Sequence, residues 1–362
     1  MFIASILFIV LLLIVKAVQF FALSSVYKTS RISDPVVSRI PLSVIIALKN
    51  EATHVNELVK ALLKQTYDSN LYEVIFVDDN STDDTYSLLT SLTEQHANMT
   101  VLKAVDKPYP AKKGALAIGI HASHFPHLLF TDGDCVPQER WIESFAAEFS
   151  NNKDILIGAA PFYSTGSLLN KIVCYENLVN TMLTISFLAL RRPYSAVGRS
   201  IGYSKEAYRK VKGFEQTMDT VSGDDDLFIR EAVRNNLQIG ILTSQRALVF
   251  SHTPDTFQSY NNQKVRHLKT SHHYPLATQS AIFLWHECNY IAQYFFLLAF
   301  LSPFAYAVSA TKIVLDIVMY SVFQKKLGYK FSVTNIFLFS FSYELLLLFN
   351  LLNSIFKKPQ WK

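Results

Sequence analysis

The sequence predicts an α/β domain with apolar, membrane-spanning segments at both ends of the chain. Between about residues 40 and 250, apolar strand-like runs alternate with amphipathic helical stretches, and polar residues gather where the strands end. The longest apolar stretches lie at the N-terminus and after about residue 280, which predicts the membrane segments. A sheet of this class binds its ligand in a crevice at the carboxyl ends of its strands.

The composition is that of a membrane protein with a polar middle. Half of the 362 residues are hydrophobic and only 17% are charged, which is low for a soluble protein. The net charge is +5, and the basic residues cluster beside the apolar blocks. This pattern favours contact with membrane lipids at a cytoplasmic surface over nucleic acid, for which there is no motif and no dense basic stripe. The three isolated cysteines indicate neither a disulfide framework nor a zinc site.

The first apolar stretch, Phe2–Leu23, is long enough to cross a hydrocarbon core of ~30 Å. A cleaved signal peptide is the alternative, but it requires positive charge before the apolar run. Here Lys16 lies inside the run, and Lys28, Arg31 and Arg39 follow it. We therefore expect an uncleaved anchor whose C-terminal side faces the cytoplasm.

The middle of the chain alternates between the two element types. Expected strands are Pro41–Leu48, Glu73–Val77, Met99–Ala104, a run from Leu128, Ile155–Ala160, and regions in 196–204 and 238–250. Expected helices are Thr53–Gln65, Ala115–His121 and Leu227–Asn235. The long apolar segment Leu168–Leu190 is interrupted by polar residues, so we expect a helix on the membrane surface and not a span.

Three further spans are expected near residues 283–303, 304–323 and 334–355. Lysines in the loop before the last of them mark that loop as cytoplasmic. The predicted organisation is an anchor over residues 1–25, a cytoplasmic domain over 40–275 and a C-terminal membrane domain over 280–356. The chain is thus expected in the cell (inner or plasma) membrane as a multi-pass protein.

Asp132 and Asp134 follow the strand at Leu128 and are separated only by Gly133. In an extended segment, residues two apart point the same way, so both carboxylates can face one point. Two hard oxygen ligands there suit a divalent cation that also holds phosphate oxygens. The alternative is a solvated acidic turn.

A second polar stretch, Asp78 to Thr85, follows the strand Glu73–Val77. Carboxylates at such a position can accept hydrogen bonds from a base N–H or from ribose hydroxyls, while Ser81 or Asp83 can cap the next helix. Neither the dinucleotide-binding glycine fingerprint nor the Walker-type phosphate loop occurs in the sequence.

Four blocks together resemble glycosyltransferase family 2 with a GT-A fold, in the family's order and at its spacing. They are Ile45–Glu51, Val77–Thr85, Lys112–Leu116 and Asp132–Asp134. The resemblance implies a mixed, mainly parallel sheet with flanking helices. It covers roughly residues 40 to 270, and the membrane segments fit branches resembling ceramide glucosyltransferase-like and polysaccharide synthase-like enzymes.

The resemblance implies a nucleotide-sugar donor, expected to be a UDP-sugar, bound with Mg²⁺ or Mn²⁺. Asp79, together with Asp78, falls where the family holds the base and ribose, and Asn50 and Glu51 fall where it lines the nucleotide pocket. Lys112 or Lys113 would neutralise diphosphate oxygens. Asp132 would contact the sugar or ribose, with a share in the metal site, and Asp134 would ligate the metal.

In the family, the general base is an acid that starts a helix, which resembles Gly223-Asp224-Asp225-Asp226 here. The register stays open among the three acids; Asp225 is favoured, and Asp224 and Asp226 are alternatives. A single base implies inversion at the sugar C1 without a covalent intermediate.

Membrane-integrated members often carry Gln-x-x-Arg-Trp after the base. Gln263 and Arg266 match this motif as acceptor- or diphosphate-binding residues, but His267 replaces the Trp. This departure, and the small number of spans, favours transfer of one sugar to a lipid or lipid-linked glycan acceptor in glycolipid or cell-envelope polysaccharide synthesis. A processive polysaccharide synthase and a non-catalytic nucleotide-sugar-binding membrane protein are the alternatives.

Overall fold

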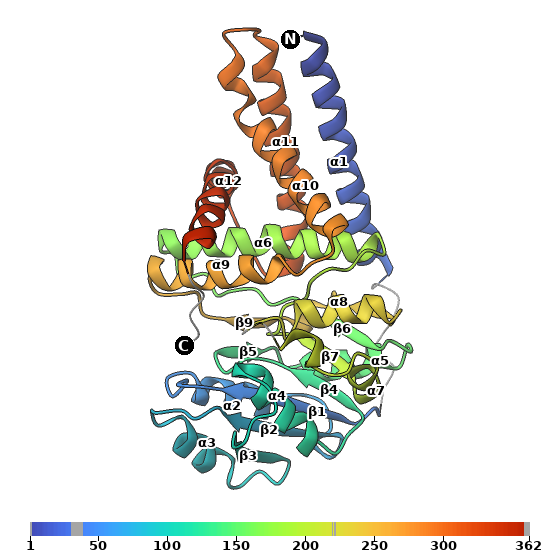
Figure 1. The fold of residues 1–362 in the computed structure, drawn as a ribbon, viewed down its shortest axis with the longest axis vertical. Helices are drawn as coiled ribbons and strands as arrows, with labels where there is room; N and C mark the ends of the chain where they lie inside the picture. The colour runs from blue at the N-terminus through green and yellow to red at the C-terminus, as the bar shows by residue number, and fades with distance from the viewer. Residues whose placement is uncertain (1, 30–38, 219, 221, 358–362) are drawn as a thin grey trace. The chain divides into compact units, whose positions relative to one another are not determined.

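The computed structural model describes residues 2–29, 39–218, 220 and 222–357. Arg31, used above to predict topology, lies outside these ranges. The described chain forms two compact units, whose elements are labelled in Figure 1. The helical unit contains residues 2–28, 164–190 and 254–357, and the sheet unit contains the described residues of 39–163 and 191–253. The predicted domain 40–275 thus includes two stretches, 164–190 and 254–275, that belong to the helical unit.

The sheet unit has, among its described residues, a seven-stranded sheet in the order β3-β2-β1-β4-β7-β6-β8. β3, β2, β1 and β4 run parallel, β7 is antiparallel to both β4 and β6, and β8 is parallel to β6. This confirms the mixed, mainly parallel sheet. The strands are β1 Leu42–Leu48, β2 Tyr72–Asp78, β3 Met99–Lys103, β4 His127–Phe130, β6 Ile155–Ile157, β7 Ile201–Ser204 and β8 Ile239–Ile241.

Both faces of this sheet are covered, because alternate residues of a strand face opposite sides and those of β1 are all buried. Val44 and Ile46 share a hydrophobic cluster with residues of α2, α3 and α5, while Ile45 lies in a second cluster with residues of α4, α7 and α8. These helices are α2 Val55–Leu63, α3 Thr85–Thr93, α4 Ala111–Ala122, α5 Trp141–Phe149, α7 Lys205–Lys210 and α8 Asp226–Arg234. The layered core fixes the strand ends from which the site is built.

A second, two-stranded antiparallel sheet pairs β5 Cys135–Pro137 with β9 Val249–Ser251. The sequence predicted neither β5 nor α5. A strand of three residues is too short to show alternation, so periodicity cannot find it.

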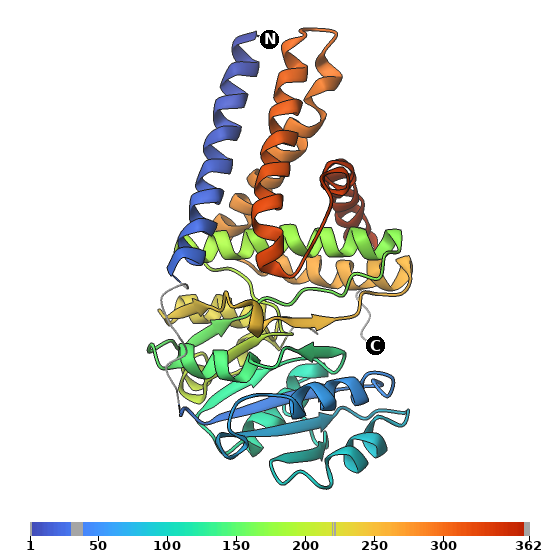
Figure 2. The same ribbon diagram turned by 180° about the vertical axis from the view of Figure 1, so that it is seen from behind.

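The helical unit contains α1 Phe2–Thr29, α6 Leu168–Ala189, α9 Phe257–Ser271, α10 Leu276–Tyr294, α11 Phe304–Phe323 and α12 Val333–Phe356. In Figures 1 and 2, α1, α10 and α11 share one general direction, and α6 and α9 lie across it. The polar stretch from Thr256 to His273 is largely the helix α9. Thr256 and Ser259 form a capping box at its start.

Four described segments are long and apolar enough to cross a membrane, by length and composition: Phe2–Lys28, Leu168–Ala189, Phe304–Leu327 and Val333–Phe356. Three of them agree with predicted spans. The span predicted near 283–303 is not among these four segments; it falls on α10 and on the 3-10 helix Phe295–Leu298 that follows, and it stays a prediction. His286, Glu287, Asn289 and Gln293 make this helix more polar than a typical span.

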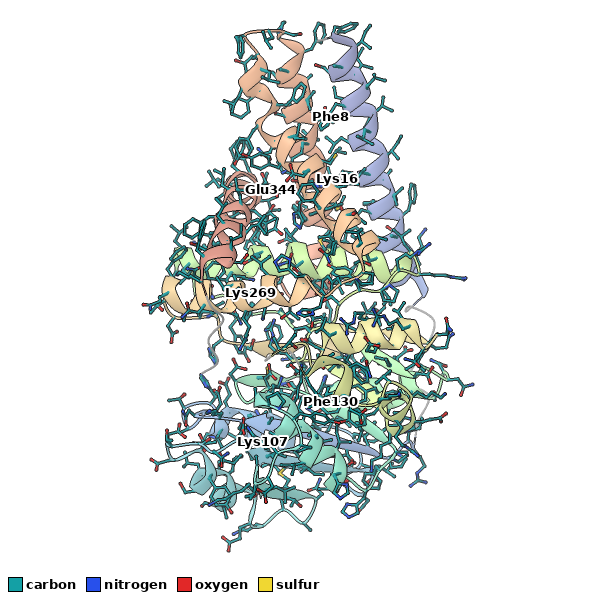
Figure 3. The ribbon with its side chains drawn as sticks, viewed as in Figure 1. Phe8, Lys16, Lys107, Phe130, Lys269 and Glu344 are labelled. Carbon is teal, nitrogen blue, oxygen red and sulfur yellow. The ribbon has the colours of Figure 1, made fainter. Side chains whose placement is uncertain are left out.

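A buried ionic cluster joins α1 to α11. Lys16 Nζ lies 2.8 Å from Asp316 Oδ1, and Lys312 Nζ lies 2.7 Å from Asp316 Oδ2 (Lys16 is labelled in Figure 3). Lys312 also donates to the Gln293 side chain of α10 at 2.7 Å. All three charged side chains are buried, so their charges are satisfied by one another and not by water.

Candidate functional site

The residues predicted as a site follow the carboxyl ends of neighbouring parallel strands. The order β3-β2-β1-β4 brings four strand ends to one edge of the sheet. Asn50 and Glu51 follow β1, Asp78 and Asp79 close β2, and the pair Asp132 and Asp134 follows β4. Lys107, which the sequence analysis did not single out, follows β3.

The carboxylates of Asp78 and Asp79 differ in their hydrogen-bond partners. The Asp79 backbone N–H donates to the Leu48 carbonyl at 2.7 Å, and its Oδ1 accepts from Lys107 Nζ at 2.6 Å (Lys107 is labelled in Figure 3). Asp78 Oδ1 is buried and has no hydrogen-bond partner among the described residues. A buried acceptor without a donor is costly, so this oxygen is suited to receive an N–H or O–H from a ligand.

Asn50 connects the ends of β1 and β2. Its backbone is left-handed, with φ of 55°, and its Oδ1 accepts from the Thr82 backbone N–H at 2.8 Å. Its own N–H donates to Ser81 Oγ at 3.0 Å. The amide of Asn50 is therefore engaged in shaping the loop after β2.

Glu51 lies against the Asp-Gly-Asp turn. A Cβ at Gly133 would lie 2.9 Å from Glu51 Cγ and 3.0 Å from Leu48 Cδ2, so only glycine fits there without displacement. One Glu51 oxygen lies 2.9 Å from His54 Nδ1. The glycine between the two aspartates is thus explained by close packing.

Asp132 and Asp134 converge, but not for the predicted reason. The segment is a turn, in which the Cys135 N–H donates to the Asp132 carbonyl at 3.3 Å, and not an extended strand. Even so, ligand atoms of Asp132, Asp134 and Cys135 all lie within 4.8 Å of one another. Burial raises the pKa of the Cys135 thiol well above its usual range, and the two carboxylates add to this. The thiol therefore stays protonated and donates to Asp134 Oδ1 at 3.5 Å, which leaves two carboxylates, ligands that fit Mg²⁺ or Mn²⁺.

Lys112 joins this turn to the acids before α8. Its Nζ lies 2.6 Å from Asp132 Oδ1 and 3.0 Å from Asp224 Oδ2. Burial lowers the pKa of Lys112, but Asp132 and Asp224 outweigh burial and raise it above its ordinary value. Burial likewise raises the pKa of Asp224, but the Lys112 cation outweighs this and lowers it. Both groups are therefore charged at neutral pH.

Asp225 differs from Asp224 in its surroundings. Its Oδ2 accepts from the Gly198 N–H at 2.8 Å and its Oδ1 from the Asp226 N–H at 2.7 Å. Burial raises the pKa of Asp225 well above its usual range, and the neighbouring carboxylates of Asp226 and Asp224 raise it further. Asp226 Oδ1 accepts from the Leu227 N–H at 2.8 Å, at the start of α8. Of the three acids, Asp225 has the environment typical of a proton acceptor that works near neutral pH.

Lys113 lies elsewhere. It is fully buried, and its Nζ donates to the Thr217 carbonyl at 2.5 Å and to Thr220 Oγ1 at 2.9 Å. These contacts tie the Lys113 ammonium to Thr217 and Thr220, so the structure favours Lys112 over Lys113 as the cation of the site.

Gln263, Arg266 and His267 lie on α9, in the helical unit. The Arg266 carbonyl accepts from Thr270 Oγ1 at 3.0 Å within the helix. Their role toward an acceptor or a diphosphate stays a prediction.

Comparison with known proteins agrees with this geometry. Residues 43–211 match the family model described as glycosyl transferase family 2. The chain carries a family 2 glycosyltransferase domain. All the strand-end residues above lie within the matched range, and the acids before α8 follow it.

Two curated glycosyltransferases are similar to part of this chain. Glycosyltransferase AglE of Haloferax volcanii is 32% identical over 117 residues, which are 32% of this chain and 38% of that protein. Beta-monoglucosyldiacylglycerol synthase of Synechocystis sp. is 30% identical over 216 residues, which are 55% of this chain and 42% of that protein. The matches thus span about two fifths of the length of these curated relatives.

The mannosyltransferase PcManGT from Pyrobaculum calidifontis, solved with GDP-Man and Mn²⁺, has a TM-score of 0.51 and 16% identity. The similarity covers 95% of this chain and 99% of that one, and at this identity it concerns the fold alone. It confirms the GT-A fold predicted for the glycosyltransferase domain.

Two further residues of the glycosyltransferase domain complete the cluster. A Cβ at Gly198 would lie 3.3 Å from Asp225 Oδ2 and 3.4 Å from Lys112 Nζ, so a side chain there would crowd both groups. Lys107 holds Asp79. Neither Lys107 nor Gly198 belongs to the four sequence blocks. Only their places in the chain, Lys107 after β3 and Gly198 before β7, could have indicated them.

Proposed function

We propose that the chain is a membrane-bound inverting glycosyltransferase. It moves a sugar from a nucleotide-sugar, expected to be a UDP-sugar, to a hydroxyl of a lipid or lipid-linked acceptor. The observation that carries this proposal is Lys112, whose ammonium contacts both Asp132 of the donor block and Asp224 beside the base. It supports a single pocket in which donor-binding and proton-accepting groups are neighbours.

The donor would lie along the strand ends. The unpartnered Oδ1 of Asp78 suits an N–H of the nucleobase, and Asp79, oriented by Lys107, suits the ribose hydroxyls. Lys112 would neutralise negative charge on the diphosphate. A divalent cation held by Asp132 and Asp134 would supply further stabilisation of the charge on the leaving diphosphate.

Asp225 would take the proton from the acceptor hydroxyl. The acceptor oxygen then forms a bond to C1 of the sugar while the bond from C1 to the diphosphate oxygen breaks. The nucleoside diphosphate leaves with the electron pair of that bond, and C1 is inverted. The Gly198 and Asp226 N–H groups hold the Asp225 carboxylate in place, and each oxygen keeps a second lone pair for the proton.

The proposal includes a cell-membrane location with the catalytic domain in the cytoplasm. Four apolar segments support the membrane location. The basic residues next to the apolar segments favour the cytoplasmic side for the catalytic domain, where nucleotide-sugars are expected. His267 in place of the motif Trp favours single transfer over polymerisation, and product length on a gel would distinguish the two.

The test is Asp225→Asn in the full-length protein. We expect loss of sugar transfer, by at least about 100-fold, with binding of the UDP-sugar changed less than threefold. Asp224→Asn, which breaks an ion pair but leaves Asp225, is the matched control and should retain measurable transfer. Full activity in Asp225→Asn would reject this residue as the base.

A further inference from the structure

Arg199 is a basic residue of the glycosyltransferase domain that lies outside the four sequence blocks. It directly follows Gly198, whose N–H donates to Asp225 Oδ2 at 2.8 Å. Its carbonyl accepts from Thr131 Oγ1 at 2.8 Å, and Thr131 directly precedes Asp132. The backbone of Arg199 is thus fixed between the proton-accepting carboxylate and the Asp-Gly-Asp turn.

The side chain of Arg199 lies beside the same turn. Its Nη1 donates a hydrogen bond to Ser251 Oγ. Ser251 is paired with Cys135 in the sheet of β5 and β9, so their side chains share one face of that sheet. The Cys135 thiol in turn donates to Asp134 Oδ1 at 3.5 Å. Burial raises the pKa of this thiol and the Arg199 guanidinium lowers it, which agrees with a position of the guanidinium near Asp134.

The positive charge of Arg199 has no carboxylate partner among the described residues. Its side chain contacts the Ser251 hydroxyl and the face of the Phe162 ring, with the guanidinium carbon 4.1 Å from the ring centroid. The residue is only 9% exposed. A charge of this burial is unfavourable without an anion, so the position suits a ligand that supplies one.

Two nitrogens of Arg199, Nε and Nη2, are available to such a ligand. Neither forms a hydrogen bond to a described residue, and neither is fully buried, so both can be reached from solvent. The N–H groups of Nε and Nη2 point the same way from one edge of the guanidinium, which is the geometry that binds two oxygens of one phosphate. Nη1 and the Phe162 contact hold the rest of the group in place.

The other charges of the site favour a phosphate at this position. Lys112 is already shared between Asp132 and Asp224, at 2.6 and 3.0 Å. A divalent cation held by Asp132 and Asp134 would be balanced by those two carboxylates. The negative charge of a diphosphate then requires a further cation, and Arg199 lies beside the same turn with its charge uncompensated.

We propose that Arg199 binds the diphosphate of the nucleotide-sugar through Nε and Nη2. The proposal rests on the function proposed above and names a further catalytic residue of that reaction. A guanidinium stays protonated in proteins, so this contact is present at any pH at which the enzyme works. When the bond from C1 to the diphosphate oxygen breaks, that oxygen gains negative charge, which the guanidinium stabilises.

The test compares the binding of UDP with that of uridine to the full-length protein in detergent with Mn²⁺. Kd values are measured by competition with a fluorescent UDP analogue. Arg199→Met removes the charge and keeps most of the side-chain length, so we expect UDP to bind about tenfold more weakly or worse, the loss of a charge-assisted hydrogen bond. Uridine has no phosphate, and its Kd should change less than about twofold. Unchanged UDP affinity in Arg199→Met would overturn the proposal.

Ser251→Ala separates phosphate binding from a structural role of Arg199. It removes the hydrogen bond between Arg199 and β9 but keeps the guanidinium, so the Kd for UDP should change less than about threefold. If Arg199 only ties β9 to the turn, both variants should weaken UDP and uridine to the same extent, and that result would also overturn the proposal. Arg246→Met, which removes an exposed arginine of the same unit, is the matched control and should leave both Kd values unchanged.

Arg199→Lys keeps a positive charge but not the paired N–H groups. It should bind UDP more weakly than the unmodified protein and more tightly than Arg199→Met. If Arg199→Met also loses uridine binding, Arg199→Lys decides in its place. Weaker UDP binding at unchanged uridine binding then supports the proposal, and unchanged binding of both overturns it.

The same measurements separate this proposal from the proposed function. If UDP binds the unmodified protein and Arg199→Met equally well, Arg199 has no part in diphosphate binding and the glycosyltransferase function stands. GDP and guanosine are measured in the same way, because the base of the donor is itself proposed. If the unmodified protein binds neither UDP nor GDP, both proposals fall.

Discussion

At the scale of single residues, Asp224 and Asp225 show how adjacent carboxyl groups acquire opposite properties. The Lys112 cation lowers the pKa of Asp224, whereas burial and neighbouring acids raise the pKa of Asp225. A general base works only when ionised, so transfer should fall as the pH drops through the raised pKa of Asp225. The acidic limb of kcat/KM is thus expected at a higher pH than for an ordinary aspartate.

Asp224→Asn should move that limb to lower pH, because it removes one of the charges that raise the pKa of Asp225. The measurement is a pH profile of kcat/KM for the unmodified protein and the variant. Glu206→Gln, at an exposed site on α7, should leave the profile unchanged. A limb that stays in place in Asp224→Asn would contradict the assignment of Asp225.

The two adjacent lysines give a second prediction at this scale. Lys112→Met should raise KM for the nucleotide-sugar about tenfold, the loss of a charge-assisted hydrogen bond, with little change in Tm. Lys113→Met should instead lower Tm by about 5 °C, because the buried ammonium donates hydrogen bonds to Thr217 and Thr220. KM and Tm are measured for both variants. If Lys113→Met raises KM and Lys112→Met lowers Tm instead, Lys113 is the donor-binding lysine and Lys112 the structural one.

At the scale of elements, α1 and α11 are joined by the cluster of Lys16, Lys312 and Asp316. Asp316→Asn would leave two buried ammonium groups without an anion, and we expect a loss of about 3–5 kcal/mol of stability. Thermal unfolding in detergent measures this. Replacement of all three residues by apolar ones (Lys16→Met, Lys312→Met, Asp316→Leu) should recover most of the lost stability. If the Asp316→Asn protein is as stable as the original, the cluster contributes little to stability.

Elements also show what sequence patterns can and cannot predict. β1 and β2 were predicted within two residues, because a buried parallel strand is a continuous apolar run bounded by polar residues. The turn at Asp132–Asp134 was given only as an alternative to an extended segment, because a turn and a strand end have similar local sequences. The position of Lys107 beside Asp79 depends on the pairing of β2 with β3 and on the loop after β3, which no local pattern encodes.

At the scale of the whole molecule, the sheet unit should face the cytoplasm. In inside-out membrane vesicles, protease should cleave within residues 40–163 and 191–253, whereas right-side-out vesicles should protect both stretches. Fragments are identified by mass spectrometry. Protection of these stretches in inside-out vesicles would contradict the orientation.

The pairing of β6 with β7 has a consequence for the side of the membrane on which α6 lies. Ile155 pairs with Tyr203 in one sheet, although α6 separates the two strands in the chain. A helix that crossed the bilayer would deliver the chain to the opposite leaflet, and residues 190–200, which contain no helix, would have to return through hydrocarbon with unpaired backbone groups. We therefore expect Leu168–Ala189 to begin and end at the same leaflet despite its apolar composition.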